Sequence, residues 1–415
     1  MKPVVIVGAG LAGLTCARAL KRRRIPFLLL DGDDRVGGRV KTDSIGPFRI
    51  DRGYQVYFTA YPHAREQIDE ERLRLKQYEP GAIIIWDGEH HLISRDNPLQ
   101  LAVSGFLSTA DKLRLGRWTS DVQWLDKDDI DEIPDRTIEQ YLRDEGFSDG
   151  FIDRFARPFL GGVFLDRSLQ TSCRQLLFVW KAISEGIAAV PEQGMEEIPR
   201  QLGMTIGHER LRLKSQVVEL VREGDTVSGV KLESGEVVES DRVVLACDAI
   251  HAAALSGISI PAEFLHSITI YFKAAEQPVD GRWVVMNGNM RGITNHVIPL
   301  ANANSVEAGN LIGATILGER TETDEQLAEI VKSEMRVWFP NRDVESWELF
   351  RAYRNHNAQM VQHPGFQSRL PGNDSGIPGL YFAGEFTTNS SIDGAIQSGA
   401  ECADLILSSL EAGVP

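Results

Sequence analysis

The sequence predicts an α/β protein of two domains, one of them a nucleotide-binding domain. Its N-terminus shows a β-branched apolar run at residues 3–7, a helical pattern at 11–24 and a second apolar run at 25–30. This order is typical of a βαβ unit of a parallel sheet, about 30 residues long. Near the C-terminus, a strand pattern at 379–383 precedes a helical pattern at 393–407. We therefore expect both chain ends to belong to one domain.

The middle of the chain predicts a second domain of helices and mixed sheet. Residues 98–180 have a mostly helical pattern, and the apolar runs on either side of Asp87 and Gly88 predict a hairpin. Further strand patterns occur at residues 267–273, 283–286, 295–298 and 310–316. The nucleotide-binding domain is therefore expected to be discontinuous, with residues 1–80, 190–261 and 351–415, and the second domain to comprise residues 81–189 and 262–350.

Composition narrows the possible partners. The chain has 415 residues and a formal net charge of −15, which argues against nucleic acid because phosphates require clustered Lys and Arg. Its four cysteines have no metal-binding spacing, so we expect no metal site and free thiols in the cytoplasm. No apolar run approaches the roughly 18 residues of a membrane span. The apolar stretch 99–107 is compatible with a core helix, a substrate entrance or a peripheral membrane contact.

A glycine motif follows the first strand and opens the first helix. Gly8 permits a tight turn, Gly10 lets a pyrophosphate approach the backbone, and Gly13 permits close packing of helix and strand. Asp31, near 20 residues further on, suits a ribose 2′-hydroxyl and would repel a 2′-phosphate. The motif predicts a dinucleotide site formed by Gly8, Ala9, Gly10, Leu11, Ala12, Gly13 and Asp31.

Two further segments indicate that the dinucleotide is FAD. Gly37 and Gly38 again permit a close backbone approach, and Arg39 offers a fork of donors to a phosphate oxygen. An NAD site has no need of this element. At the C-terminus, Glu385 follows Gly384 and suits cofactor hydroxyls. The helix that begins near Asp393 would direct N–H groups and positive dipole at the flavin edge where charge collects on reduction.

With these motifs the chain resembles the FAD-dependent amine oxidase superfamily, which includes monoamine and polyamine oxidases, protoporphyrinogen oxidase and the carotenoid (phytoene) desaturases. The resemblance implies a two-domain, glutathione-reductase-like FAD-binding fold with a mixed-sheet and helical substrate domain. Because no cysteine lies between Cys247 and Cys402, the covalent cysteinyl-flavin of monoamine oxidases is not expected, and the FAD should be non-covalent. It also rests on residues 50–55 and on residues 191–195, where Gln193 replaces a glycine of the family's turn. The further cofactor contacts that it implies are Gly32, Gly38, Arg39, Gly53, Tyr54, Gln55, Val218, Gly384, Glu385, Asp393, Gly394 and Ala395.

Several departures place the chain closer to the desaturase-like branch. The family's amine oxidases carry an aromatic pair before the flavin, but residues 387–391 are small and polar. Those oxidases also place a lysine at the flavin, for which Lys273 is the nearest candidate, with an exposed strand end as its alternative. Residues 157–164 are similar to a stretch of desaturase-like members. His356 and His363 are candidates for a base or for structural histidines.

The sequence therefore predicts an FAD-dependent oxidoreductase that takes hydride from a C–H bond of a mostly apolar small molecule. Three alternatives stay open: a flavin amine or amino-acid oxidase, a non-redox flavin-dependent isomerase, and a non-catalytic flavin-binding protein. The sequence identifies neither the catalytic residues nor the substrate, the electron acceptor or the oligomeric state.

Overall fold

The predicted parallel sheet is present and unites distant parts of the chain. The computed structural model describes residues 2–53, 56–96, 104–300 and 310–412. The sheet has the strand order β10-β2-β1-β14-β20, and all of these pairs are parallel. Its carboxyl ends therefore meet at one edge. The strands are β1 (Val4–Val7), β2 (Phe27–Leu30), β10 (Leu211–Arg212), β14 (Val243–Leu245) and β20 (Leu380–Phe382).

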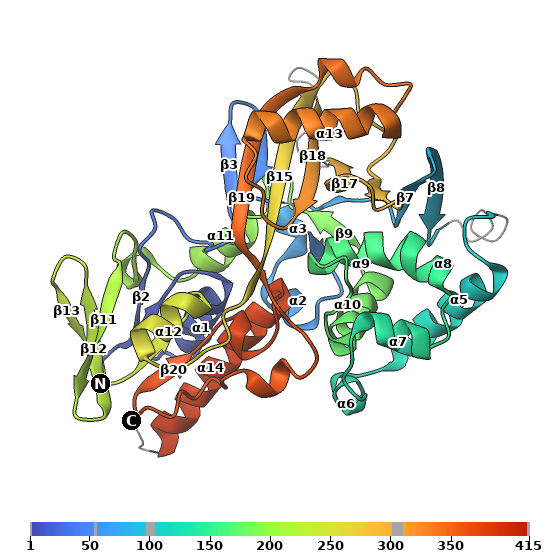
Figure 1. Ribbon diagram of the computed structural model, residues 1–415. Helices are drawn as coiled ribbons and strands as arrows, with labels where there is room; N and C mark the ends of the chain where they lie inside the picture. The colour runs from blue at the N-terminus through green and yellow to red at the C-terminus, as the bar shows by residue number, and fades with distance from the viewer. Residues whose placement is uncertain (1, 54–55, 97–103, 301–309, 413–415) are drawn as a thin grey trace.

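Helices from both chain ends cover this sheet. Leu14 and Leu20 of α1 share an apolar core with Ile396 and Ile406 of α14, so the first and last helices pack together, as Figure 1 shows. This arrangement confirms the predicted α/β class and the expectation that both chain ends fold together. The helices around the sheet are α1 (Leu11–Arg22), α2 (Pro62–Gln67), α3 (Glu70–Leu73), α11 (Glu197–Met204), α12 (Ala249–Ser256) and α14 (Ile392–Ala412).

A larger mixed sheet has the order β19-β15-β18-β17-β16-β7-β8. The predicted hairpin joins β7 to β8, and Asp87 and Gly88 both have the positive φ that its tight turn requires. Helix α13 (Asp324–Trp338) lies across this sheet, and its Val331 and Met335 are fully buried. The strands are β7 (Gly81–Trp86), β8 (Glu89–Ser94), β15 (Phe264–Ala274), β16 (Val284–Asn287), β17 (Thr294–Pro299), β18 (Asn310–Leu317) and β19 (Glu348–Met360).

The predicted helical region forms a layer beside β7, β8 and β16 (Figure 1). Pro158 lies at the start of one of its helices, directly after a π-helical turn, where the missing N–H and the proline ring disfavour the regular hydrogen-bond ladder. Of the stretch 99–107, residues 99–103 lie outside the described residues, whereas Phe106 and Leu107 are buried in this layer's core. The helices are α5 (Thr109–Trp124), α6 (Lys127–Glu132), α7 (Ile138–Asp144), α8 (Asp149–Phe151), η1 (Ile152–Ala156), α9 (Arg157–Phe164) and α10 (Cys173–Glu185).

Smaller sheets complete the fold. They comprise β3 (Thr42–Ile45) with β4 (Phe48–Asp51), β5 (Tyr57–Phe58) and β6 (Lys76–Gln77) on β9 (Ala188–Val190), and β11 (Val217–Glu223), β12 (Thr226–Leu232) and β13 (Val237–Glu239). The predicted domain boundary between residues 350 and 351 falls inside β19, and the domain limits stay a prediction. Within the described part of the chain, none of the helices has the length and apolar character needed to span a bilayer.

Candidate functional site

A cavity of about 940 Å³ begins at the carboxyl edge of the parallel sheet and extends between the helical layer and the mixed sheet. This volume lies near the upper end of the roughly 300–1,000 Å³ of small-molecule sites. Its lining includes the residues that follow β1, β2, β14 and β20, as well as side chains of α5, α9, α10, β16 and β17. The cavity therefore connects the predicted nucleotide site to a chamber inside the second layer of the protein.

The glycine motif forms the cradle that the sequence predicts. Gly8 has a φ of +110°, and a Cβ there would lie 2.6 Å from the carbonyl oxygen of Ala246, so only glycine fits. A Cβ at Gly13 would lie 1.9 Å from the carbonyl oxygen of Gly8. At Gly10, by contrast, a Cβ would meet no atom within 4 Å. Gly10 thus borders open space at the start of α1, where the helix dipole favours an anion.

Asp31 lies beside this cradle. Its Oδ2 accepts a hydrogen bond from the Ala9 N–H at 2.6 Å, and its Oδ1 accepts one from the Asp33 N–H at 2.8 Å. These bonds fix the carboxylate, whose remaining lone pairs can accept ribose hydroxyls.

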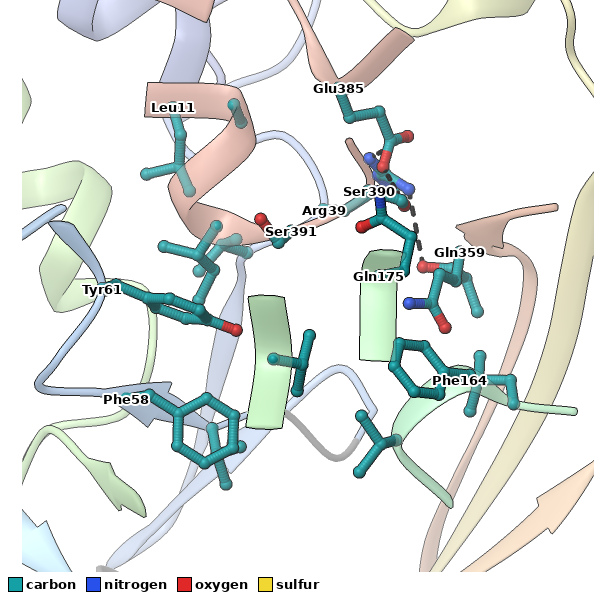
Figure 2. A pocket seen from close by; sticks show the side chains of 18 of the residues that line it. Leu11, Arg39, Phe58, Tyr61, Phe164, Gln175, Gln359, Glu385, Ser390 and Ser391 are labelled. Carbon is teal, nitrogen blue, oxygen red and sulfur yellow. Dashed lines mark hydrogen bonds and ion pairs between the residues drawn. The ribbon is translucent and has the colours of Figure 1, made fainter. Parts of the chain in front are cut away.

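Arg39 and Glu385 face each other across the cavity edge and form an ion pair, as Figure 2 shows. The Glu385 side chain is 6% exposed, and its other oxygen accepts a hydrogen bond from the Ser390 hydroxyl. Arg39 also donates to the carbonyl oxygen of Asn357 at 3.2 Å. The guanidinium therefore lies beside the glycine cradle, in a position from which it can bind a phosphate group.

The predicted cofactor residues divide into two groups. Those that line the cavity are Gly8, Gly10, Leu11, Ala12, Asp31, Gly32, Gly38, Arg39, Gly384, Glu385 and Ala395. Ala9, Gly13, Gly53, Val218, Asp393 and Gly394 are not among its lining residues. Val217 lines the cavity, while the neighbouring Val218 side chain is exposed. Tyr54 and Gln55 lie outside the described residues.

Asp393 has a role that the sequence did not predict. Helix α14 begins at Ile392, and Ser391 Oγ accepts the Gly394 N–H at 2.8 Å. The Asp393 side chain instead caps α2, because its Oδ1 accepts the N–H groups of His63 and Ala64, both at 2.8 Å. Burial raises the pKa of this carboxyl. Because the Asp393 side chain is engaged at α2, the predicted flavin contact of Asp393 can involve only its backbone, and it stays a prediction.

The inner chamber is apolar and was missed by sequence reasoning. Phe159 lies on α9 and Trp180 on α10, and their rings meet edge to face with centroids 6.0 Å apart. Phe58, Tyr61 and Phe164 point into the same space in Figure 2. An apolar residue on a helix has the same sequence spacing whether it packs in the core or lines a cavity. The sequence therefore contains no signal that distinguishes these lining residues from core residues. The apolar lining residues of the helices, of the residue after α9 and of β7, β8 and β16 are Ala82, Ile93, Leu115, Phe155, Phe159, Val163, Phe164, Leu165, Val179, Trp180, Ile183, Val284 and Met286.

A few neutral polar groups interrupt this lining. Gln175 and Gln362 are 5% and 3% exposed, and Gln359 contributes a buried Oε1 that accepts no hydrogen bond from the described residues. Such amides give a ligand donors and acceptors without charge.

His296 on β17 also lines the chamber. Arg167 donates to Asn295 Oδ1 at 2.8 Å, so the Asn295 amide nitrogen faces His296 Nδ1 at 3.1 Å. Nδ1 is therefore an acceptor, which places the proton of the neutral ring on Nε2. Burial, assisted by the charge of Arg167, lowers the pKa of His296 from 6.5 to about 3. The imidazole is thus uncharged at neutral pH.

The other candidate catalytic groups lie away from the cavity. Lys273 is exposed on β15, which agrees with the alternative interpretation of this residue as an exposed strand end. No lysine occurs among the described residues that line the cavity. His356 and His363 are exposed, and neither lines it. Phe386, by contrast, borders the cavity, and its ring packs against Phe382 in the core with centroids 5.8 Å apart.

The residues present fit an FAD. The open cradle at Gly10 suits a pyrophosphate, Asp31 suits a ribose, and Arg39 with Glu385 suits the phosphate and hydroxyls of the flavin half. The chamber beyond them leaves room for a second molecule. Fold and cavity together define a flavoprotein oxidoreductase.

Comparison with known proteins agrees with this class. The model of the family described as flavin containing amine oxidoreductase matches residues 11–407, so the chain belongs to that family. FAD is accordingly its cofactor, and the predicted superfamily is confirmed.

Individual relatives are distant. Protoporphyrinogen oxidase 2 of Arabidopsis thaliana is 28% identical over 167 residues, which are 39% of this chain and 32% of that protein. The lycopene-forming phytoene desaturase of Pseudescherichia vulneris is 26% identical over 294 residues, which are 60% of this chain and 56% of that protein. The matches thus span about a third and about half of these relatives. A solved oxidoreductase from Methanosarcina mazei has the same fold, with a TM-score of 0.76, 17% identity and coverage of 97% and 100% of the two chains.

Proposed function

We propose that this protein is an FAD-dependent oxidoreductase that removes hydride from a C–H bond of a neutral, mostly apolar small molecule. One observation carries the proposal: the nucleotide site opens into a chamber whose helical and sheet walls are apolar, aromatic or uncharged. The described residues of α5, α9, α10, β16 and β17 that line the chamber include no carboxylate and no lysine. A cationic substrate would lose its hydration against these walls, and the charged residues that line the cavity next to β7 and β8 are one carboxylate, Glu79, and one guanidinium, Arg95.

The protein's part in this chemistry is to bind, orient and exclude water. Bound FAD supplies the hydride acceptor. Phe159 and Trp180 offer apolar surface on which a flat or extended molecule can pack. Gln175 and Gln359 can orient polar atoms of a substrate by neutral hydrogen bonds. Orientation of the reacting C–H bond against the flavin is worth a large part of such a barrier.

The relatives that match this chain favour the same direction. Two of them, which match over 167 and 294 residues, are named a protoporphyrinogen oxidase and a phytoene desaturase, whereas a putative monoamine oxidase of Mycobacterium tuberculosis matches over only 50 residues. Amine oxidation, the alternative within this family, finds less support because Lys273 is exposed and the residues after Glu385 contribute no second aromatic ring. The open chamber also favours an enzyme over a protein that only binds flavin. The free cysteines support our placing the protein in the cytoplasm.

Product analysis tests the proposal. The FAD-loaded protein is incubated under air, and then with a soluble quinone, with a polyene, a porphyrinogen and a panel of primary amines. We expect a product of the polyene or porphyrinogen class that has lost two hydrogen atoms, by mass spectrometry. Peroxide and an aldehyde from an amine would instead establish the amine oxidase. An isomer of unchanged mass, formed without oxidant, would establish the isomerase.

A further inference from the structure

Three potential metal ligands meet on the mixed sheet, away from the cavity lining. His266 lies on β15, His356 lies on the neighbouring β19, and Glu319 follows the end of β18 on the other side of β15. Backbone pairs next to these residues bring them together: the N–H of Gly318 donates to the carbonyl of His266 at 2.9 Å, and Ser267 pairs with Leu317 and with Asn355. The pairing of these strands thus brings the three side chains to one place at the edge of regular pairing.

The ligand atoms have nearly the spacing that a metal requires. Glu319 Oε1 lies 3.1 Å from His356 Nδ1 and 3.7 Å from His266 Nδ1, and the three groups offer ligand atoms within 4.8 Å of one another. Tetrahedral Zn²⁺ with bonds of roughly 2.0–2.1 Å separates neighbouring ligand atoms by about 3.3 Å. Small side-chain rotations therefore suffice to close the site.

A simple ion pair accounts for only part of this geometry. The 3.1 Å contact of Glu319 with His356 is an ordinary hydrogen bond. His266 Nδ1, however, is buried and has no hydrogen-bond partner in the described chain. Burying a polar atom without a hydrogen-bond partner costs free energy, and a metal ion bound to this ring nitrogen would remove that cost.

We infer that His266, Glu319 and His356 bind one divalent transition-metal ion of the zinc type. Two imidazole nitrogens and one carboxylate oxygen suit Zn²⁺, Ni²⁺ or Cu²⁺, whereas Mg²⁺ and Ca²⁺ prefer oxygen ligands alone. Glu319 and His356 have side-chain exposures of 61% and 69%, so solvent completes the coordination and the ion exchanges freely. This site differs from the prediction of no metal, because its ligands are far apart in sequence and show no spacing motif.

The position of His356 gives the ion a structural role. The pairing of β19 with β15 jumps from Gln359 opposite Leu265 to Asn355 opposite Ser267, which marks a bulge at residues 356–358. In this bulge the Asn357 carbonyl accepts a hydrogen bond from Arg39, and Ala358 lines the FAD cavity. Bulges re-aim side chains, and a metal bound at His356 fixes this one on its outer side.

Zinc titration of the FAD-loaded, tag-free protein tests the site. After chelator treatment, calorimetry with Zn²⁺ is compared for the natural chain, Glu319→Gln, His356→Asn and the control His208→Ala, which changes another exposed histidine. We expect one saturable site per chain in the natural protein and in the control. Loss of a ligand weakens metal sites by more than about tenfold, so both site variants should bind at least that much more weakly.

Thermal unfolding gives a second readout that does not depend on activity. Zn²⁺ should raise Tm of the natural chain and of the control with increasing concentration, and should leave Tm of both site variants unchanged. Without metal, the variants should unfold at the temperature of the natural chain, because both changed side chains are mostly exposed. The inference would be overturned if the natural chain showed no saturable Zn²⁺ binding. It would also be overturned if Glu319→Gln and His356→Asn bound Zn²⁺ as tightly as the natural chain.

Discussion

Arg39 and Glu385 form an ion pair at the edge of the cavity although 346 positions separate them in the sequence. Arg39 follows the second glycine pair, and Glu385 follows the last strand of the parallel sheet. The pair therefore joins the two chain ends at the point where the flavin half of the cofactor is expected. Glu385 is the buried partner and Arg39 the accessible one, so Arg39 is the residue able to turn towards a phosphate.

Replacing Arg39 with alanine should release FAD. A hydrogen bond to a charged group contributes roughly 1.5–3 kcal/mol, which corresponds to about a 10- to 100-fold change in affinity. FAD retained through gel filtration and the Kd from flavin fluorescence measure the effect. Arg39→Lys should restore part of the affinity, because it keeps the charge but loses the fork of donors. Equal FAD affinity in Arg39→Ala and the natural chain would contradict a phosphate contact.

Gly10→Ala should lose FAD affinity without losing stability. The backbone of Gly10 has φ −76° and ψ −176°, which any residue adopts, and the added methyl group meets no protein atom. The cofactor-free protein should therefore unfold within about 0.5 kcal/mol of the natural chain. Gly8→Ala is the contrast, since its positive φ and its contact with Ala246 should destabilise the fold itself. Tight FAD binding by Gly10→Ala would show that no phosphate lies against this position.

His296 should make the protein less stable in acid. Its pKa is about 3 when folded and 6.5 ordinarily, so the unfolded chain binds more protons between these values. Its contribution is fully present above pH 6.5 and is lost as the pH falls towards 3. Asp51, whose pKa burial raises to about 6, acts in the opposite sense, which is why a difference measurement is needed.

His296→Gln supplies that difference because it removes the titration and keeps a polar side chain. Relative to the variant, the natural chain should lose up to roughly 3 kcal/mol of unfolding free energy between pH 7 and pH 4. Urea unfolding at both pH values measures it. A constant difference between the two proteins would mean that His296 titrates normally and is not desolvated in the chamber.

Lys273→Met should leave both FAD binding and turnover within about twofold of the natural chain, since surface changes away from a site rarely exceed 0.5 kcal/mol. Lys273 is exposed on β15 and does not line the cavity. A much larger loss of kcat with normal FAD content would revive an amine oxidase mechanism with lysine at the flavin.

Local sequence patterns predicted several backbone features of the fold well. The turn at Gly8 and the hairpin at Asp87 and Gly88 both follow from short-range sequence patterns. Each depends on backbone conformation or on a local hydrogen bond, which a few residues determine. The proposed FAD contacts at Gly8 and Gly10 rest on the same kind of local pattern.

Long-range features were not predictable in this way. Strand β19 is polar and mostly partly exposed, so it lacks the apolar alternation that identifies a strand, and its neighbour β15 supplies the pairing. Phe159 and Trp180 line a chamber, but on a helix they have the same spacing as core residues. Asp393 resembles the cap of its own helix and instead caps α2, a partner that only the tertiary structure brings close.

The central claim is that flavin and apolar chamber form one active site for a neutral substrate. Anaerobic mixing of the FAD-loaded protein with single donors, followed at the oxidised flavin band, tests it most directly. We predict that a polyene or porphyrinogen bleaches the flavin and that primary amines leave it oxidised. Rapid bleaching by an amine, with none by any neutral apolar donor, would contradict the account.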